Sequence, residues 1–416
     1  MDLAGKDAGS SRMGALAMVL AAVAIVSSAF HFWPLENSRT WQMLCPSNLA
    51  VLIWLPICGF WLLRKDARQK AAGLLPHVSV LAYVAINVLS VAFAPDFGRA
   101  ANFTIKLALM LVGGYILLTF AISSEKTLKI SYILAAAAAG ISVFYCLAAR
   151  FGFGSDSFAF HGSAYKYGTY IGILVPMCGV YLLTDSRSWP KLLGGVLAAG
   201  AILSSGSLGA VAAIVAGLAL SVVLLPRLPV RLSIIGSVVC GIGALFLLSS
   251  NPAVATLKND IRLAEQDASN LRQRYIEWQA EINLLQERTV TGTGAGCINA
   301  YRSSFYYRLP KLNTLEAFDQ NGYLATAAET GILGLVCFCW VVFNYGKQAF
   351  AAVVTARRKS DVTRHRFAAA NLAGLAGAVV ANLFSSVHYN GILIAFVLVL
   401  ALIARTQQLY GEQFDA

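Results

Sequence analysis

The sequence predicts an all-α, polytopic membrane protein with about twelve transmembrane helices and one large extramembrane loop. The first observation is composition: 58% of the residues are hydrophobic and 12% are charged, whereas a soluble domain carries about 25% charged residues. The second is that apolar runs of about 20 residues recur along the chain. The third is that basic residues gather in every second connection between these runs. Together they exclude a soluble globular domain.

The apolar runs are long enough to cross a bilayer, which takes roughly 20 residues, with shorter runs tolerated inside a bundle. They cover residues 14–33, 43–63, 74–94, 104–123, 128–149, 165–184, 191–206, 208–225, 231–249, 323–346, 366–387 and 391–404. The seventh and eighth runs are joined only by residues 204–207, so one broken element is an alternative interpretation. The first run lacks a small-residue cleavage site, so we expect a membrane span there rather than a signal peptide.

Loop charges predict the orientation, because cytoplasmic connections of membrane proteins are enriched in Lys and Arg. Threading the twelve runs through a membrane brings the basic connections to one side, and both termini fall on that side. These connections contain Lys6, Arg12, Arg64, Lys65, Arg68, Lys70, Lys126, Lys129, Arg187, Lys191, Arg227, Arg231, Lys347, Arg357, Arg358, Lys359, Arg364 and Arg366. We therefore expect a multi-pass bacterial inner-membrane protein with cytoplasmic termini and a functional face toward the periplasm.

The domain organisation follows from these spans. Residues 1–249 hold the first nine predicted spans, residues 250–322 form the large periplasmic loop, and residues 323–416 hold the last three spans and a cytoplasmic tail. Within the loop, apolar residues between Leu257 and Leu285 recur at steps of three and four, which predicts an amphipathic helix of roughly 30 residues, about 45 Å long. We expect this helix to lie on the membrane face or over the bundle.

Several functional classes are disfavoured by the chemistry of the chain. The net charge of +12 is distributed by membrane side rather than over one domain, so we expect membrane lipids and no nucleic acid as partners. Most of the eight cysteines lie in apolar runs and read as buried hydrophobes rather than a disulfide framework. The five histidines are scattered, and no cluster has metal-ligand spacing, so we expect neither a metal nor another cofactor.

The stretch from Phe318 to Leu335 closes the polar loop and opens an apolar run. Asp319, Gln320 and Asn321 stand where a helix enters the membrane, and Glu329 follows inside the apolar run, where an ionised group is costly. These features point to a site at the helix mouth. The alternative is a helix N-cap followed by an ordinary packing face that includes Gly331 and Gly334.

The loop before this stretch carries aromatic and cationic candidates. Rings stack on sugar faces and arginine forks bind phosphate, so Tyr301, Arg302, Tyr306 and Arg308 are candidate substrate-binding residues. An interfacial belt of the membrane gives the same composition. Arg274, supported by Arg272, is either a diphosphate-binding cation or a snorkelling side chain. His161 and His388 lie in connections of the same outer face, as site residues or as hydrogen-bonded loop histidines.

The TGTGAG segment at 291–296 invites comparison with a nucleotide-binding loop. A phosphate-binding loop of that kind needs a preceding strand and a following helix with a lysine. Neither is present in the sequence pattern, so we do not assign a nucleotide here.

The order of short motifs resembles the O-antigen ligase/polymerase superfamily, which are membrane glycosyltransferases. RxxxW at Arg274–Trp278, TGTGAG, QNGYL at 320–324 and GILG at 331–334 resemble its RxxxW, GxGxG, HNxxL and GxxG elements. FHGSA at 160–164, continuing to Pro176, and SSGSLGA at 204–210 resemble two earlier motifs. Two positions depart from the pattern: Gln320 replaces the family histidine and Leu208 replaces an arginine.

The resemblance implies a fold of the GT-C type and transfer of a glycan from undecaprenyl diphosphate to an acceptor hydroxyl. Arg274 would stabilise the diphosphate leaving group. Because glutamine is no base, Asp319 or Glu316 is expected to accept the proton, with His161 and His388, from other loops, as the alternatives. Gln320 and Asn321 would orient a sugar. We expect an O-antigen ligase with lipid A-core as acceptor. A Wzy-type polymerase that lengthens a growing polysaccharide is the alternative, followed by a lipid-linked sugar transporter or a non-catalytic binder.

Overall fold

The computed structural model describes residues 4–30, 45–62, 74–152, 164–225, 228–247, 270–298, 321–388 and 390–411. Every regular element in these ranges is helical, and they contain no strand. The helices are α1 (Ala4–Ser27), α3 (Pro46–Leu62), α5 (Val78–Ser90), α6 (Phe97–Ala108), α7 (Tyr115–Ala121), α8 (Glu125–Gly152), α9 (Ala164–Leu183), α10 (Ser188–Ser204), α11 (Leu208–Leu224), α12 (Leu228–Leu247), α14 (Asn270–Glu287), α16 (Gly322–Arg358), α17 (Val362–Ala381) and α18 (Asn390–Gly411). The all-α prediction is confirmed at this level.

Each predicted apolar run coincides with a helix or, for 104–123, with α6 and α7 joined by a π-helical turn at Leu109–Gly114. Five helices of the described ranges are long and apolar enough to cross a membrane: Phe97–Ala121, Glu125–Ala149, Tyr165–Leu183, Gly322–Arg358 and Ile392–Tyr410. The crossing of the other runs stays a prediction. Large apolar side chains such as Phe60 and Phe144 are 71% and 73% exposed, as expected of a surface that faces lipid.

The runs at 191–206 and 208–225 form two helices rather than one broken element. The Ser205 backbone is extended (φ −62°, ψ 135°), which ends α10, and the Ser207 side chain accepts a hydrogen bond from Ala210 N at 3.2 Å to begin α11. Capping by a serine hydroxyl in this way satisfies an otherwise unpaired amide of the first turn. The two helices then pack on different partners, α10 mainly on α12 and α9, and α11 mainly on α17 and α9.

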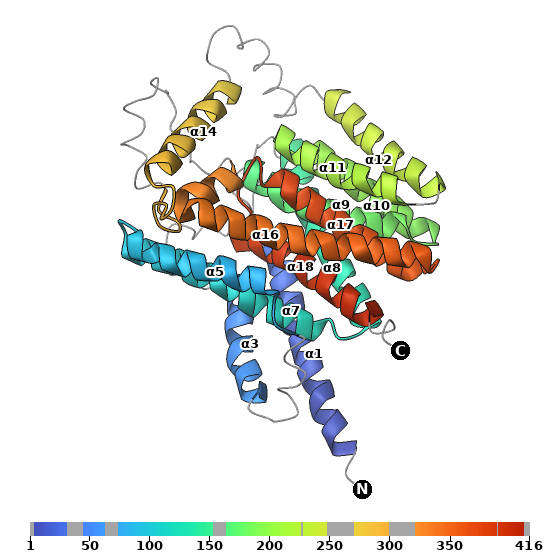
Figure 1. The fold of residues 1–416 in the computed structure, drawn as a ribbon. Helices are drawn as coiled ribbons and strands as arrows, with labels where there is room; N and C mark the ends of the chain where they lie inside the picture. The colour runs from blue at the N-terminus through green and yellow to red at the C-terminus, as the bar shows by residue number, and fades with distance from the viewer. Residues whose placement is uncertain are drawn as a thin grey trace.

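The centre of the bundle is α9, which packs against α17, α11 and α10 (Figure 1). Small residues allow these helices to approach closely, since a Cβ on Gly377 of α17 would overlap the carbonyl oxygen of Gly172 in α9. A Cβ on Gly217 of α11 would likewise overlap Pro176 and the Ala373 carbonyl. Small-residue packing is typical of helices that associate in lipid, where burial of apolar surface offers no driving force.

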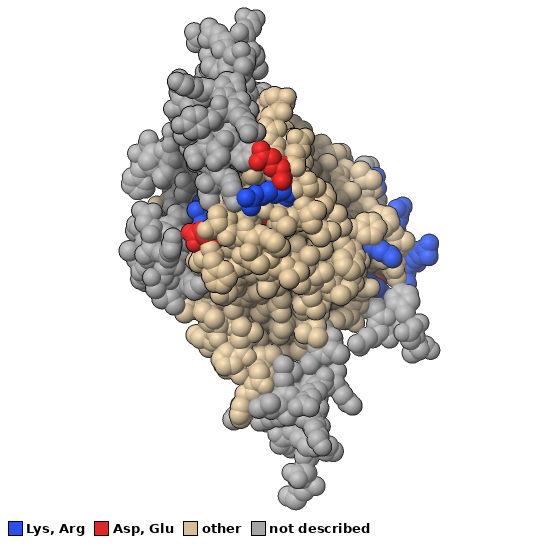
Figure 2. Space-filling view, turned by 60° about the vertical axis from the view of Figure 1, so that its left-hand side comes forward, with Lys and Arg blue, Asp and Glu red and all other residues tan. Residues whose placement is uncertain are grey.

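Charged side chains mark two ends of the bundle. On the face shown in Figure 2, described Lys, Arg, Asp and Glu gather in two zones, with a wide uncharged surface between them. Hydrogen bonds bring several basic connections to one end: Arg405 Nε donates to Ile122 O at 2.6 Å, and Arg366 pairs with Asp185 at 2.7 Å. The junction of α16 and α17 lies at this end, and α14 lies at the other (Figure 1).

Candidate functional site

The candidate site begins with a break in α16. Gly331 has φ 72° and ψ −179° in the middle of the helix, a backbone region that is essentially restricted to glycine. The sequence pattern predicts that Gly331 belongs to a small-residue packing face. In the structure, Gly331 instead interrupts the helix. At a helix break, nearby backbone amides and carbonyls lose their intrahelical hydrogen bonds. They must then find other hydrogen-bond partners, because unpaired buried backbone groups are costly.

The segment at residues 289–297, here called the glycine-rich turn, supplies these partners. Thr293 N donates to Ala328 O at 2.9 Å, and Gly294 N donates to Glu329 O at 2.8 Å. In return, Ile332 N donates to Thr289 O at 2.8 Å. The broken helix and the turn are therefore joined by backbone hydrogen bonds on both sides of Gly331.

Three glycines with positive φ shape this turn: Gly292 (64°), Gly294 (92°) and Gly296 (70°). A side chain on them would overlap the Glu329 carbonyl of α16, Ala94 after α5, and Phe103 of α6, respectively. The turn thus lies in close backbone contact with three helical segments. The alternation of glycines in TGTGAG follows from this packing.

Five amides of the turn already donate hydrogen bonds within the protein, which argues against a nucleotide-binding loop. Besides the two bonds to α16, Gly292 N donates to Arg288 O at 2.9 Å, Ala295 N to Ser90 Oγ at 3.1 Å and Cys297 N to Gly294 O at 3.0 Å. A phosphate cradle requires several such amides to point at a ligand.

The start of α16 lies in the same corner. Asn321, which is 8% exposed, accepts hydrogen bonds from Tyr323 N at 3.0 Å and Leu324 N at 3.2 Å and so caps the helix. Gly322 N donates to Asn382 O at 2.7 Å, and a Cβ at this glycine would overlap the Asn382 side chain. The capping alternative predicted for this stretch is what the structure shows for Asn321, and its contact with substrate stays a prediction.

His388 lies beside these elements, in the connection between α17 and α18. Its Nδ1 is 2.9 Å from Ser386 Oγ, and its Nε2 is 2.8 Å from the Tyr83 hydroxyl of α5. The rings of Phe338 and Phe103 stand at 5.5 and 6.4 Å from the imidazole. Burial among these groups lowers the pKa of His388 to about 4, so the imidazole is neutral at pH 7 although part of its surface stays accessible.

The sequence predicts that His388 lies on the outer face, but it does not predict the hydrogen-bond partners of this residue. Tyr83 lies in a predicted span some 300 residues earlier, and Ser386 lies in a run that was expected to be membrane-embedded. Apolar periodicity carries no signal for either contact.

The helix α14 carries Arg272 and Arg274 and packs against α16. Its buried face differs from the predicted apolar stripe. Tyr275 and Ile282 of that stripe are 63% and 39% exposed, whereas Glu277 and Glu281 are each 1% exposed. The helix therefore turns a face with two carboxylates toward the protein.

The other predicted site residues, His161, Tyr301, Arg302, Tyr306, Arg308, Glu316, Asp319 and Gln320, lie outside the described residues. Within the described ranges, no three His, Cys, Asp or Glu side chains come together in a way that could hold a metal ion. The absence of a metal requirement stays a prediction.

An α-helical bundle with several helices fit to cross a membrane, and with its candidate site at a helix break near one end, defines an integral membrane protein. Residues 193–339 match the family model described as O-antigen ligase (Wzy_C), and this match over about a third of the chain supports membership of the O-antigen ligase/Wzy-type superfamily. The match runs from α10 through the glycine-rich turn into α16 and includes Gly331, so it covers the site's backbone framework. No curated protein matches the chain.

The predicted resemblance to this superfamily is therefore confirmed. The family supports a transferase in general terms that acts on lipid-linked polysaccharide.

Proposed function

We propose that this protein transfers a glycan from undecaprenyl diphosphate to a hydroxyl group of lipid A-core at the periplasmic face of a bacterial inner membrane. The observation that carries the proposal is the coincidence of two features: the match to O-antigen ligases, and a site framework, built from the matched segment, in which the glycine-rich turn joins the break in α16.

The proposed topology has twelve spans. Residues 1–249 and 323–416 form the transmembrane part, with both termini cytoplasmic, and residues 250–322 form the periplasmic loop. This arrangement is supported by the gathering of the connections that follow α7, α9 and α16 at one end of the bundle, because cytoplasmic connections are the basic ones.

The reaction requires a cation for the leaving group. The acceptor oxygen attacks the anomeric carbon of the glycan, the bond from that carbon to the diphosphate oxygen breaks, and the carrier leaves as undecaprenyl diphosphate. Arg274, with Arg272 in support, would stabilise the charge that develops on the diphosphate. Both belong to α14, which is continuous with the glycine-rich turn and packs on α16.

The reaction also requires a base for the acceptor proton, and the family histidine is replaced by Gln320. Asp319 and Glu316 are the candidates from sequence. His388, which approaches from the connection between α17 and α18, is a further candidate, because its imidazole is neutral at pH 7 and its pKa of about 4 is close to that of a carboxylate. Binding of an anionic diphosphate nearby would raise this pKa, because an opposite charge favours the protonated form.

Substrate orientation is assigned to polar residues around this corner. Gln320 and Asn321 would orient a sugar, and Tyr301, Arg302, Tyr306, Arg308 and His161 would bind saccharide or phosphate. No metal or other cofactor enters the proposal.

The test is reconstitution of the purified protein in liposomes with an undecaprenyl-diphosphate-linked glycan, with and without lipid A-core. Transfer that depends on lipid A-core supports the ligase. Lengthening of the carrier-linked glycan without lipid A-core identifies the polymerase instead. No product in either reaction refutes the transferase.

Two arginine variants with the same loss of charge sharpen the test. Arg274→Ala should abolish transfer, whereas Arg358→Ala, at the other end of the bundle, should leave it unchanged. Wild-type activity in Arg274→Ala would reject its role at the diphosphate.

A further inference from the structure

The junction of α16 and α17 encloses a cavity of about 250 Å³, at the end of the bundle opposite the glycine-rich turn. The ends of α9 and α11 and the start of α12 complete its walls. We propose that this α16–α17 pocket binds the phosphate head group of an anionic phospholipid. The inference does not depend on the proposed function.

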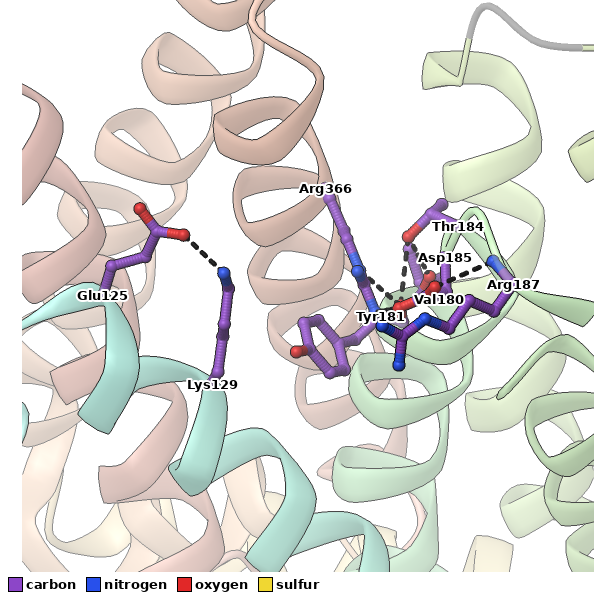
Figure 3. Close-up of polar contacts among 8 residues, drawn as sticks. All are labelled: Glu125, Lys129, Val180, Tyr181, Thr184, Asp185, Arg187 and Arg366. Carbon is purple, nitrogen blue, oxygen red and sulfur yellow. Dashed lines mark hydrogen bonds and ion pairs between the residues drawn. The ribbon is translucent and has the colours of Figure 1, made fainter. Parts of the chain in front are cut away.

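Two arginines line the pocket, and one of them is held in place by several contacts (Figure 3). Arg366 Nη2 lies 2.7 Å from Asp185 Oδ2, its Nε donates to Tyr181 O at 2.7 Å, and its guanidinium stands 3.9 Å from the centre of the Tyr181 ring. A guanidinium fixed in this way loses little side-chain entropy when an anion binds. Arg357 is exposed at the rim.

The connections that form the pocket carry more cations than carboxylates. Asp185 is the ion-pair partner of Arg366, and Asp361 Oδ1 accepts a hydrogen bond from Arg364 N at 2.9 Å at the start of α17. Across residues 184–191 and 355–366, seven cations (Arg187, Lys191, Arg357, Arg358, Lys359, Arg364 and Arg366) stand against two anions, Asp185 and Asp361. The excess favours an anionic ligand.

The backbone at the pocket is also shaped locally. Ser360 lines the pocket with φ 54°, in the left-handed region that few residues other than glycine adopt. Its conformation lets Asp361 N donate to Ala356 O at 3.0 Å and so ends α16. The turn directs the hydroxyl-bearing residue and the first turn of α17 to the same cavity.

The remaining lining and the surroundings favour a lipid over a soluble phosphate. Leu225, Val230 and Val362 give the pocket an apolar wall. On the neighbouring helices, Trp189, Leu232 and Phe350 are 61%, 58% and 53% exposed, which provides apolar surface for acyl chains. An exposed tryptophan beside basic residues is typical of the head-group level, and basic pockets between helices bind acidic head groups.

The test uses the full-length protein in nanodiscs of phosphatidylcholine alone or with one part in five phosphatidylglycerol, with retained lipid counted by native mass spectrometry. We expect phosphatidylglycerol to be retained in preference to phosphatidylcholine. Arg357→Ala should weaken this retention about tenfold, the value of one charge-assisted hydrogen bond. Arg358→Ala removes the same charge one residue away, outside the pocket lining, and should leave retention unchanged.

A second pair of variants tests the cavity without changing charge. Val230→Phe fills the pocket and should displace the lipid, whereas Val239→Phe, at a position of α12 that is 62% exposed, should not. Equal effects of Arg357→Ala and Arg358→Ala would overturn the proposal in favour of diffuse surface charge. Equal retention of both lipids, or displacement of the lipid by millimolar inorganic phosphate, would also overturn it.

Discussion

Replacing Gly331 with alanine tests whether the break in α16 is a built feature of the site. Alanine at this position must adopt φ near 72° with an extended ψ, and its Cβ would overlap the Val290 carbonyl of the glycine-rich turn. The nearest atoms are all backbone atoms of Thr289 and Val290, so no side-chain rotation can relieve the clash. Either α16 straightens or the turn moves away.

The cost has two parts. Holding a residue in such a sparsely populated backbone region costs about 1–3 kcal/mol. If the turn moves, the three backbone hydrogen bonds across the break are lost, and each contributes about 0.5–1.5 kcal/mol. We therefore expect Gly331→Ala to lower the free energy of unfolding by roughly 2.5–7.5 kcal/mol.

The matched control is Gly346→Ala in the same helix. A Cβ there would meet only Leu375 Cδ2, at an ordinary 3.7 Å, and alanine favours a helix by about 1 kcal/mol over glycine. The assay is unfolding of purified protein in detergent by titration with SDS, together with hydrogen exchange at Thr293 and Gly294. Equal stability of the two variants, with both amides still protected in Gly331→Ala, would refute the reasoning.

Four further predictions follow from single contacts. Asn321→Ala should lower the free energy of unfolding by about 1 kcal/mol through loss of the helix cap, whereas Asn321→Asp should keep it, as measured by thermal unfolding. A stable Asn321→Asp variant without transfer activity would support the proposed substrate role. Ser360→Gly should raise stability by about 0.5–1 kcal/mol, because glycine relieves the left-handed backbone, whereas Lys359→Gly in the right-handed region should lower it. Although burial raises the pKa of Asp185, the Arg187 amide and the Arg366 guanidinium together hold it below its usual value. Asp185 therefore stabilises the fold fully above its ordinary pKa of about 4, and this stabilisation is lost as pH falls through the lower pKa of the folded state. The difference in melting temperature between wild type and Asp185→Asn should shrink below pH 4. Burial also lowers the pKa of His388, so the folded protein resists protonation of this imidazole. Stability should therefore fall as pH drops from about 6.5 toward 4, and His388→Phe, which removes the titrating group, should flatten that part of the melting-temperature profile.

The helices could be predicted from sequence because each depends on a local pattern. The apolar run at 323–346 predicts the start of α16 within one residue, and Ser204–Ser207 mark the division between α10 and α11. Such elements follow from apolar length and capping chemistry, which are read within a few residues. The same locality explains why Asn321 could be interpreted as a cap.

The break at Gly331 and the buried face of α14 could not be predicted in this way. GILG at 331–334 has the spacing of a packing face, and nothing within the helix indicates that the glycine-rich turn, some 35 residues earlier, supplies its missing hydrogen bonds. In α14 the apolar stripe predicts that Tyr275 and Ile282 are buried. In the structure these two residues are exposed, and Glu277 and Glu281 are buried instead. The environment, rather than the pattern, decides which face is inside.

The length of α16 gives the break a physical purpose. A straight helix from residue 322 to 358 would measure about 55 Å, well beyond the roughly 30 Å of bilayer hydrocarbon. The part after Gly331 alone reaches about 40 Å, which leaves the first turns free to lie at the membrane surface.

Those first turns hold Asn321 and are joined by the glycine-rich turn to α14, the helix that carries Arg274. The same three hydrogen bonds therefore join the turn that follows α14 to α16 on both sides of Gly331. On the proposed mechanism, α14 supplies Arg274 for the leaving diphosphate, and the start of α16 supplies Asn321, which orients a sugar. Gly331→Ala should thus lose transfer activity together with hydrogen-exchange protection at Thr293 and Gly294, and activity that survives loss of that protection would separate the backbone framework from catalysis.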